Sequence, residues 1–122
     1  MKGVGIDMIE VTRVANKIGK ESGFREMVFS QKEIDYCEPK ANKAEHYAAR
    51  FAAKEAFLKA IGTGWKNGTA FHEIEVQHDD EGSPELHLLG ETAKTLAPMG
   101  IQKIHLSLSH LKQIASAVVV VE

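Results

Sequence analysis

The sequence has few of the features that mark several common protein classes. It contains a single cysteine, Cys37, which excludes an internal disulfide framework and favours a reducing compartment. No apolar run approaches the roughly 18 residues of a membrane span, and Met1 is not followed by a signal-peptide pattern. The net charge at pH 7 is only −2, which gives no overall case for binding nucleic acid. We therefore expect a soluble, cytoplasmic protein with neither a membrane nor a nucleic-acid partner.

The composition is that of an ordinary globular protein. The 122 residues are 43% hydrophobic and 26% charged, which predicts one domain, residues 1–122, with one modest core. None of the six histidines has the spacing of a zinc site. The acidic segment 79–84 is shorter than the ligand loop of an EF-hand, and its Gly82 and Pro84 are typical of a turn between two strands.

The most informative stretch is a predicted helix over residues 47–61. It is rich in good helix formers, and Gly62 follows where a left-handed C-terminal cap is expected. On a helical wheel, Glu55 and Lys59 share one narrow polar stripe, while Arg50 and Lys54 share a second. A small-residue face suited to close backbone approach is formed by Ala49, Ala53, Ala56 and Ala60.

This helix is apolar nearly all round, and such a helix is normally buried. Its charges then need a partner, a metal or a water-filled cleft, because an unpaired buried charge is costly. The alternative is that Glu55 and Lys59 form only a local i,i+4 ion pair on an exposed surface.

The first predicted strand, residues 3–10, places a carboxylate beside two glycines. Its alternation puts Val4, Ile6 and Met8 on one face, and Gly3, Gly5, Asp7 and Ile9 on the other. We expect the glycines to leave space above the sheet, which makes Asp7 a candidate ligand. The alternative is an ordinary aspartate at the end of a strand, satisfied by a nearby helix start.

A basic stripe follows on the next predicted helix. The apolar residues of that helix recur at helical spacing, and the opposite face carries Arg13, Lys17 and Lys20, with Arg25 shortly after. The stripe contains no acid that offsets these charges. It is therefore a candidate docking surface for an acidic partner, although a solvated charged face is the usual explanation of such a pattern.

The remaining elements are predicted from caps and periodicity. A capping box at Ser30–Glu33 opens a short helix that runs to Cys37. Strands are expected over 71–78, around 86–88, over 103–110 and over 114–121, with a helix over 91–97. The glycine-rich segment 63–68 follows a helix and is interpreted as a turn. His110 ends a strand, where functional groups tend to lie, but a single histidine is more often structural.

Three segments together carry a family resemblance. They are Gly3 to Asp7 with Glu10 and Arg13, Arg50 to Phe57 with Lys59 and residues 62–64, and Leu106 to His110. In this order and spacing they resemble the holo-acyl-carrier-protein synthase family, the small bacterial phosphopantetheinyl transferases. The resemblance implies an α+β fold in the order strand, three helices, two strands, helix, two strands. It also implies a homotrimer with active sites between subunits, and transfer of 4′-phosphopantetheine from coenzyme A to a serine of an acyl carrier protein, in support of fatty acid biosynthesis.

The resemblance also implies roles for single residues. The magnesium-binding carboxylates fall on Asp7 and Glu55, and the catalytic lysine falls on Lys59. The coenzyme A contacts fall on Arg50, Gly62, Ser109 and His110, and the carrier-docking residues are Arg13, Lys17, Lys20 and Arg25. The sequence departs from the family after His110, where Leu111 replaces a small polar or acidic residue.

The chemistry gives these residue types a purpose. Mg²⁺ is bound through one or two carboxylates together with water and phosphate oxygens, which matches two acids from separate elements. Lys59 would stabilise or protonate the departing phosphate of 3′,5′-ADP. Either Glu55 or a metal-held water would take the proton from the serine, and the sequence leaves both open.

Two other functions are compatible with the same residues. A trimeric module that binds coenzyme A or an acidic partner without turnover would keep the basic helix but would not need both Asp7 and Glu55. A magnesium-dependent pyrophosphatase would use water in place of the carrier serine, although a small substrate requires no docking face.

Overall fold

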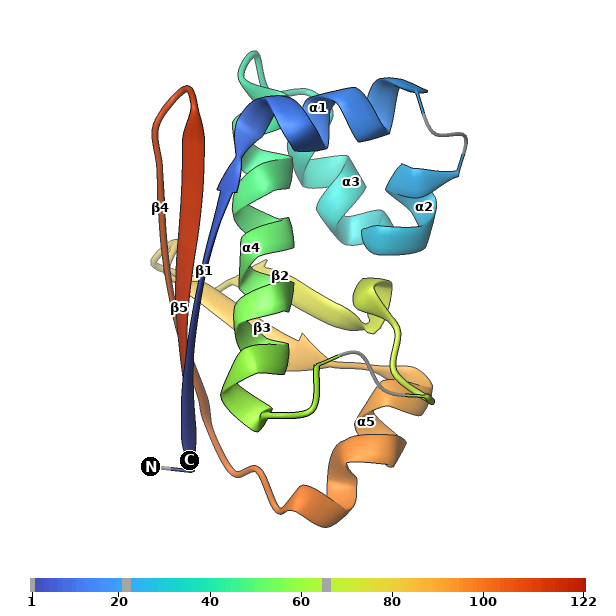
Figure 1. Ribbon diagram of the computed structural model, residues 1–122, viewed down its shortest axis with the longest axis vertical. Coiled ribbons are helices and arrows are strands. Elements are labelled where there is room, and N and C mark those ends of the chain that lie inside the picture. The colour runs from blue at the N-terminus through green and yellow to red at the C-terminus, as the bar shows by residue number, and fades with distance from the viewer. Residues whose placement is uncertain (1, 21–22, 65–66) are drawn as a thin grey trace.

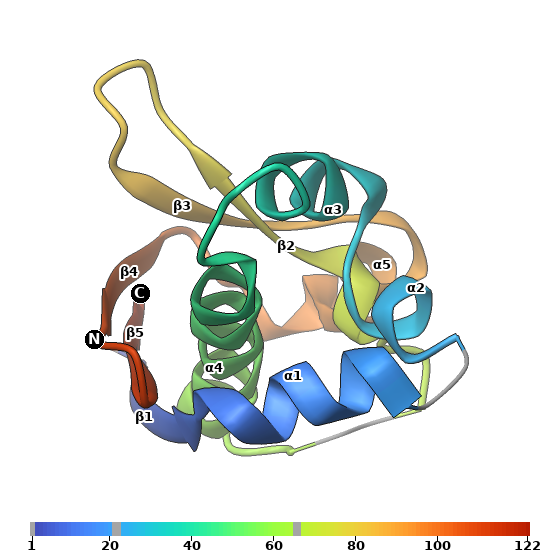
Figure 2. The same cartoon turned by 90° about the horizontal axis from the view of Figure 1, so that it is seen from above.

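One long helix, α4 (Lys43–Ile61), lies along one face of a three-stranded antiparallel sheet (Figure 1). The structure is a computed structural model, which describes residues 2–20, 23–64 and 67–122. The sheet has the strand order β1 (Gly3–Glu10), β5 (Ile114–Val121), β4 (Ile104–His110). Figure 2 shows α4 end-on, with this sheet on one side and the other elements around the rest.

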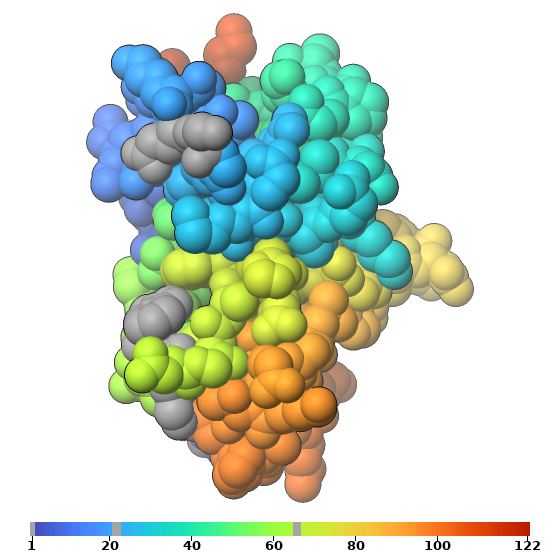
Figure 3. Space-filling model, turned by 90° about the vertical axis from the view of Figure 1, so that its right-hand side faces the viewer, coloured from blue at the N-terminus to red at the C-terminus, as the bar shows by residue number. Residues whose placement is uncertain are grey.

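The second sheet is a hairpin of β2 (Ile74–His78) and β3 (Pro84–Leu88). Its connection is the expected turn, in which the Asp79 carboxylate accepts from the backbone N–H groups of Glu81 and Ser83. Figure 3 shows this hairpin projecting beyond the helical face of the molecule. The strand predicted from Phe71 begins later, because Phe71–Glu73 form a 3₁₀ turn, η1.

The other helices are α1 (Val11–Lys20), α2 (Phe24–Val28), α3 (Gln31–Cys37) and α5 (Gly90–Leu96), which continues into the 3₁₀ turn η2 (Ala97–Met99). The α+β class is confirmed. The expected order had three helices between the first two strands, whereas the structure has four. The additional helix is α2, whose five residues are too few to show a helical period.

Two sequence expectations about helix ends are confirmed. Ser30 and Glu33 form the reciprocal capping box of α3, and Gly62 ends α4 in the left-handed region with φ 76°. Of the glycine-rich segment 63–68, Trp65 and Lys66 lie outside the described residues.

The glycines of β1 have a different purpose from the one expected. A Cβ atom on Gly3 would lie 1.9 Å from the carbonyl oxygen of Ala60, and one on Gly5 would lie 2.0 Å from that of Ala56. The glycines therefore do not leave space above the sheet. They let the backbone of α4 approach β1 at Ala56 and Ala60, two residues of the face that was expected to suit close backbone approach.

A buried ion pair joins α4 to the second sheet. Lys54 Nζ donates to Glu33 Oε1 at 2.8 Å and to the carbonyl oxygens of Phe71 at 2.9 Å and Ile74 at 2.6 Å. Glu33 Oε2 accepts from the backbone N–H of Val76 at 2.9 Å. Both charged side chains are fully buried. Burial lowers the pKa of Lys54, and the carboxylate of Glu33 opposes this shift.

The apolar residues of β1 point away from α4. Val4, Ile6 and Met8 are 55%, 59% and 66% exposed, and Val118 of the neighbouring strand is 38% exposed. The outer face of the sheet is therefore apolar along β1, and it is open in the single chain. Within the described residues, no helix combines the length and apolarity needed to cross a bilayer.

Candidate functional site

A depression of about 390 Å³ lies where β1, α1 and α4 meet. It is lined by Asp7, Met8, Ile9, Arg13, Lys17, Phe51 and Glu55. Strand alternation turns Asp7 toward α4, and the narrow polar stripe of α4 supplies Glu55. The fold thus brings together the two predicted carboxylates, Asp7 and Glu55, which are 48 positions apart in the sequence.

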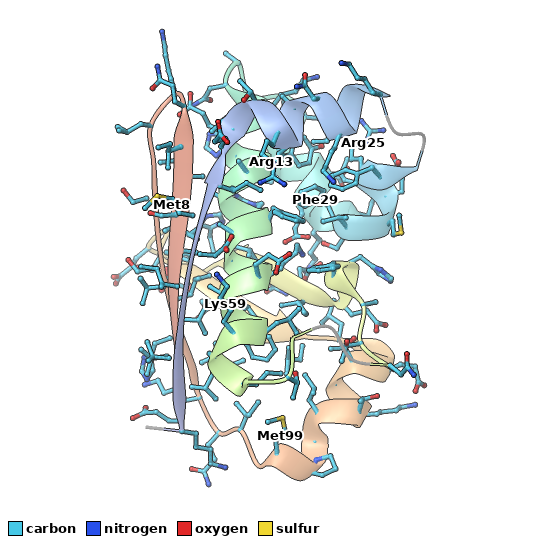
Figure 4. The ribbon with its side chains drawn as sticks, in the orientation of Figure 1. Met8, Arg13, Arg25, Phe29, Lys59 and Met99 are labelled. Carbon is cyan, nitrogen blue, oxygen red and sulfur yellow. The ribbon has the colours of Figure 1, made fainter. Side chains whose placement is uncertain are left out.

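Lys59 joins this site through Asp7. Its Nζ donates to Asp7 Oδ1 at 2.9 Å and to the carbonyl oxygen of Ile6 at 3.0 Å. Figure 4 shows the side chain pointing from α4 toward β1. None of the ion pairs among the described residues joins Lys59 to Glu55, so the alternative of a merely local i,i+4 pair does not describe this helix.

Glu55 has a different environment from Asp7. It makes no hydrogen bond or ion pair with another described residue. Its pKa is raised, chiefly because partial burial penalises the charged form, and further because the Asp7 carboxylate is a like charge; Lys59 opposes both effects. A cation between a desolvated carboxylate and a second one would offset the repulsion between them.

The donor set fits magnesium better than a transition metal. No group of three or more His, Cys, Asp and Glu side chains able to hold a metal ion occurs in the part of the chain that the structure describes. Mg²⁺ does not need such a cage, because it retains water and takes the remaining ligands from phosphates. Asp7 and Glu55 at one depression supply the two hard oxygen ligands expected of such a site.

The predicted docking residues divide into two groups. Arg13 and Lys17 line the same depression as the carboxylates, and Figure 4 shows Arg13 on the side of α1 that faces α4. Lys20 is exposed at the end of α1. Arg25 lies on α2, where its guanidinium pairs with Glu26 at 2.7 Å and Glu38 at 3.1 Å, so part of its charge is offset within the chain.

A second cluster surrounds Arg50. The residue is 2% exposed, its Nη1 donates to the carbonyl oxygen of His46 at 3.3 Å, and its Cζ lies 4.3 Å from the centroid of the Tyr36 ring. Its buried Nε has no hydrogen-bond partner among the described residues. The ring of His78 stacks on that of Tyr36, with centroids 4.9 Å apart.

His110 belongs to this second cluster. Its ring lies 5.2 Å from that of His46, and its Nδ1 is 2.9 Å from Glu45 Oε1. Burial lowers the pKa of His46, and the positive charge of Arg50 lowers it further. The family resemblance assigned both Arg50 and His110 to coenzyme A, and in the fold each of them contacts His46.

The other two predicted coenzyme A contacts lie elsewhere. Gly62 is at the C-terminus of α4. Ser109 pairs with Ser116, which pairs with Met8, so Ser109 lies on the outer face of the sheet, opposite to Asp7. One chain alone does not gather Arg50, Gly62, Ser109 and His110 around a single nucleotide.

Two residues of the Arg50 cluster were missed in the sequence. Tyr36 and His78 line a depression of about 300 Å³ together with Arg50. Neither residue is marked by a sequence motif. Tyr36 lies on the short helix α3, and His78 is the last residue of β2, which is distant from Arg50 in the sequence. Only their position in the fold makes them candidates.

Comparison with known proteins identifies similar chains over the full length. Residues 3–119 match the 4′-phosphopantetheinyl transferase superfamily. A holo-[acyl-carrier-protein] synthase of Syntrophus aciditrophicus is 45% identical over 121 residues, which cover 98% of this chain and 94% of that protein. The crystal structure of the synthase from Neisseria meningitidis has a TM-score of 0.90 at 31% identity, and covers 100% of this chain and 98% of its own. The synthase from Bacillus anthracis, solved in complex with CoA (3′,5′-ADP), has a TM-score of 0.80 at 36% identity, with 98% and 95% covered.

Proposed function

The chain belongs to the 4′-phosphopantetheinyl transferase superfamily and is an enzyme of the holo-[acyl-carrier-protein] synthase family, and we propose that it transfers 4′-phosphopantetheine from coenzyme A to a serine of an acyl carrier protein. The observation that carries the proposal is the meeting of Asp7 and Glu55 at one depression, beside Lys59 and below the basic residues of α1. Residues 1–122 act as a single domain in fatty acid biosynthesis. The single cysteine favours a cytoplasmic location.

Asp7 and Glu55 would hold Mg²⁺ together, each through its carboxylate. When bound, the ion polarises the phosphoryl oxygens and offsets the charge that develops as the diphosphate breaks. The two carboxylates come from β1 and α4, which the glycine contacts hold close together. Their relative position is therefore set by backbone packing, as a metal site requires.

The remaining chemistry belongs to residues of the chain. The serine oxygen bonds to the phosphorus that carries pantetheine, and the bond from that phosphorus to the bridging oxygen breaks, which releases 3′,5′-ADP. Glu55 accepts the serine proton. Lys59 stabilises the departing phosphate with its ammonium group.

The acidic carrier docks on α1. Arg13 and Lys17 lie at the rim of the depression that holds the carboxylates, so a partner bound there presents its serine to Glu55. Complementary charge speeds encounter and fixes register. Lys20 extends this surface, whereas Arg25 contributes less, because Glu26 and Glu38 already pair with it.

The nucleotide of coenzyme A is held by residues of two chains. Arg50 and His110 form one cluster, and Ser109 lies on the outer face of the sheet of its own chain. A second copy packed against that face would bring these groups to one ligand. The exposed side chains of Val4, Ile6 and Met8 support such packing, because large exposed apolar patches are rare on monomers. We assign the assembly as a homotrimer, as the sequence resemblance implies.

Intact-mass spectrometry of an apo carrier protein tests the proposal. Incubation with the enzyme, coenzyme A and Mg²⁺ should add the mass of phosphopantetheine, and EDTA should abolish the gain. Release of 3′,5′-ADP without carrier labelling would indicate a pyrophosphatase instead. No product of either kind would indicate a binding module.

A further inference from the structure

The ammonium group of Lys59 forms an ion pair with Asp7, the carboxylate to which the proposed function assigns a metal. Two of its three donors are used on β1, one by Asp7 Oδ1 and one by the carbonyl oxygen of Ile6. The Asp7 side chain is 16% exposed and that of Lys59 is 55% exposed. The carboxylate is therefore recessed, and its lysine partner is the more exposed of the two.

The proposed function gives these two residues separate tasks. Asp7 is to bind a divalent cation, and Lys59 is to contact a diphosphate. The ammonium group is bonded to Asp7 Oδ1, one of the two oxygens that a cation would use, and it cannot contact a diphosphate while it stays there. Glu55 lines the same depression and has no hydrogen bond or ion pair with another described residue, so it is open to a cation from the start.

We infer that Lys59 is the resident counter-cation of Asp7, and that a divalent cation displaces it. Its ammonium then turns to the diphosphate only after the metal has bound, which orders the two binding events. An ion pair with this exposure is weak, so its loss is a small cost. The lysine side chain is flexible and more than half exposed, so it has room to swing. The inference rests on the proposed function.

Mg²⁺ binding to the chain without coenzyme A tests the competition. Isothermal titration calorimetry with Mg²⁺ alone should give a roughly fivefold lower Kd for Lys59→Met than for the wild type, because the competitor is removed. The matched control is Lys17→Met, which removes a charge from the same depression without touching Asp7. We expect its gain to be about twofold or less. Equal gains in the two variants, or none in Lys59→Met, would overturn the inference.

The displacement itself can be followed by NMR of the Lys59 ammonium group in protein labelled with ¹⁵N and ¹³C, in which the ¹³C signals of the Asp7 and Glu55 carboxylates are observed as well. The Asp7→Asn variant supplies the reference position of a lysine released from its carboxylate. Saturating Mg²⁺ should move the Lys59 signal of the wild type to that position. If Mg²⁺ shifts the Glu55 signal while Lys59 stays at its original position, and carrier labelling still needs Mg²⁺, the inference fails and the proposed function stands. If neither carboxylate responds and labelling survives EDTA, the metal site fails together with the inference.

Discussion

At the scale of single residues, α4 holds two adjacent charges in opposite settings. Lys54 is fully buried and has three acceptors, whereas Glu55 is partly buried and has no hydrogen-bond partner among the described residues. The first arrangement is typical of a residue that holds a structure together. The second is typical of a site that favours function over stability.

The first prediction concerns the stability cost of Glu55. Its pKa in the native state lies above the ordinary value of 4.5, so the native state disfavours the charge. The penalty is absent below about pH 4.5 and appears as the pH rises through the native pKa. In EDTA, Glu55→Gln should therefore melt at a higher temperature than the wild type near pH 7, and the difference should disappear toward about pH 4.

The same variant should lose most of its turnover when Mg²⁺ is present. We expect a decrease of about 100-fold or more, since it removes both a metal ligand and the proton acceptor. Thermal melts across the pH range and carrier labelling rates measure the two effects. A Glu55→Gln variant that is less stable near neutral pH in EDTA would contradict the assigned electrostatics.

The second prediction concerns Lys54. Lys54→Met leaves the carboxylate of Glu33 buried without its counter-charge, and breaking such a pair costs about 3–5 kcal/mol. Urea denaturation should show this loss in the free energy of unfolding. The matched control is Lys59→Met, further along the same helix, whose partly exposed pair should cost about 1 kcal/mol or less. Similar small losses in both would show that the buried pair does not hold the second sheet.

At the scale of elements, the contact between β1 and α4 determines where Asp7 and Glu55 meet. The third prediction is that Gly5→Ala lowers the free energy of unfolding by about 3 kcal/mol or more, because its Cβ would meet the backbone of Ala56. Gly19→Ala is the control, since it lies in α1, where the added methyl group would have no atom within 4 Å among the described residues, apart from the backbone of its own helix. It should stabilise the protein by about 0.5–1 kcal/mol. Chemical denaturation of both variants measures the contrast, and an unaffected Gly5→Ala would mean that α4 does not need this close approach.

The fourth prediction concerns docking on α1. Arg13→Glu places a negative charge beside the site and should raise the KM for the acidic carrier roughly tenfold, with little change in the KM for coenzyme A. Lys94→Glu is the control, because Lys94 is exposed on α5, at the other end of the molecule from α1 (Figure 1). Steady-state kinetics at low and high salt measures both constants. Equal effects on the two substrates would exclude α1 as the docking surface.

The sequence predicts elements well where the signal is local. The capping box of α3 and the glycine cap of α4 are confirmed, because a few adjacent residues determine each. The purpose predicted for Gly3 and Gly5 was wrong, since it depends on which element packs against the strand. The ion-pair partner of Lys54 could not be predicted from the sequence either. A buried charge on the helix was expected to need one, but Glu33 lies on another helix and its position depends on the fold.

The candidate site shows the same division. The family resemblance named Asp7, Glu55 and Lys59, and the fold brings them together. The hydrogen bond from Lys59 to Asp7 could not be predicted, because helical periodicity relates Lys59 only to Glu55. Strand alternation places Ser109 and His110 on opposite faces of the sheet. Whether both contact one nucleotide depends on how a second copy of the chain packs, which the sequence of one chain does not determine.

At the scale of the whole molecule, the outer face of the sheet is apolar along β1 and uncovered in the single chain. The fifth prediction is that Ile6→Glu, which places a charge in the middle of this apolar strip, converts the proposed homotrimer to monomers at micromolar concentration. The variant should keep its fold, because Ile6 is 59% exposed and contributes little to the core of its own chain. Sedimentation velocity measures the mass and circular dichroism the fold. A trimer that survives Ile6→Glu would exclude this face as the interface.

The central claim is that an acid from β1 and an acid from α4 hold one divalent ion against a diphosphate. The most direct test is a crystal structure with coenzyme A and Mn²⁺, which replaces Mg²⁺ and is located by its anomalous scattering. We predict a single peak at about 2.0–2.2 Å from carboxylate oxygens of both Asp7 and Glu55, with phosphate oxygens completing its shell. A peak bound by the phosphates alone, or by only one of the two acids with the other turned away, would contradict the claim.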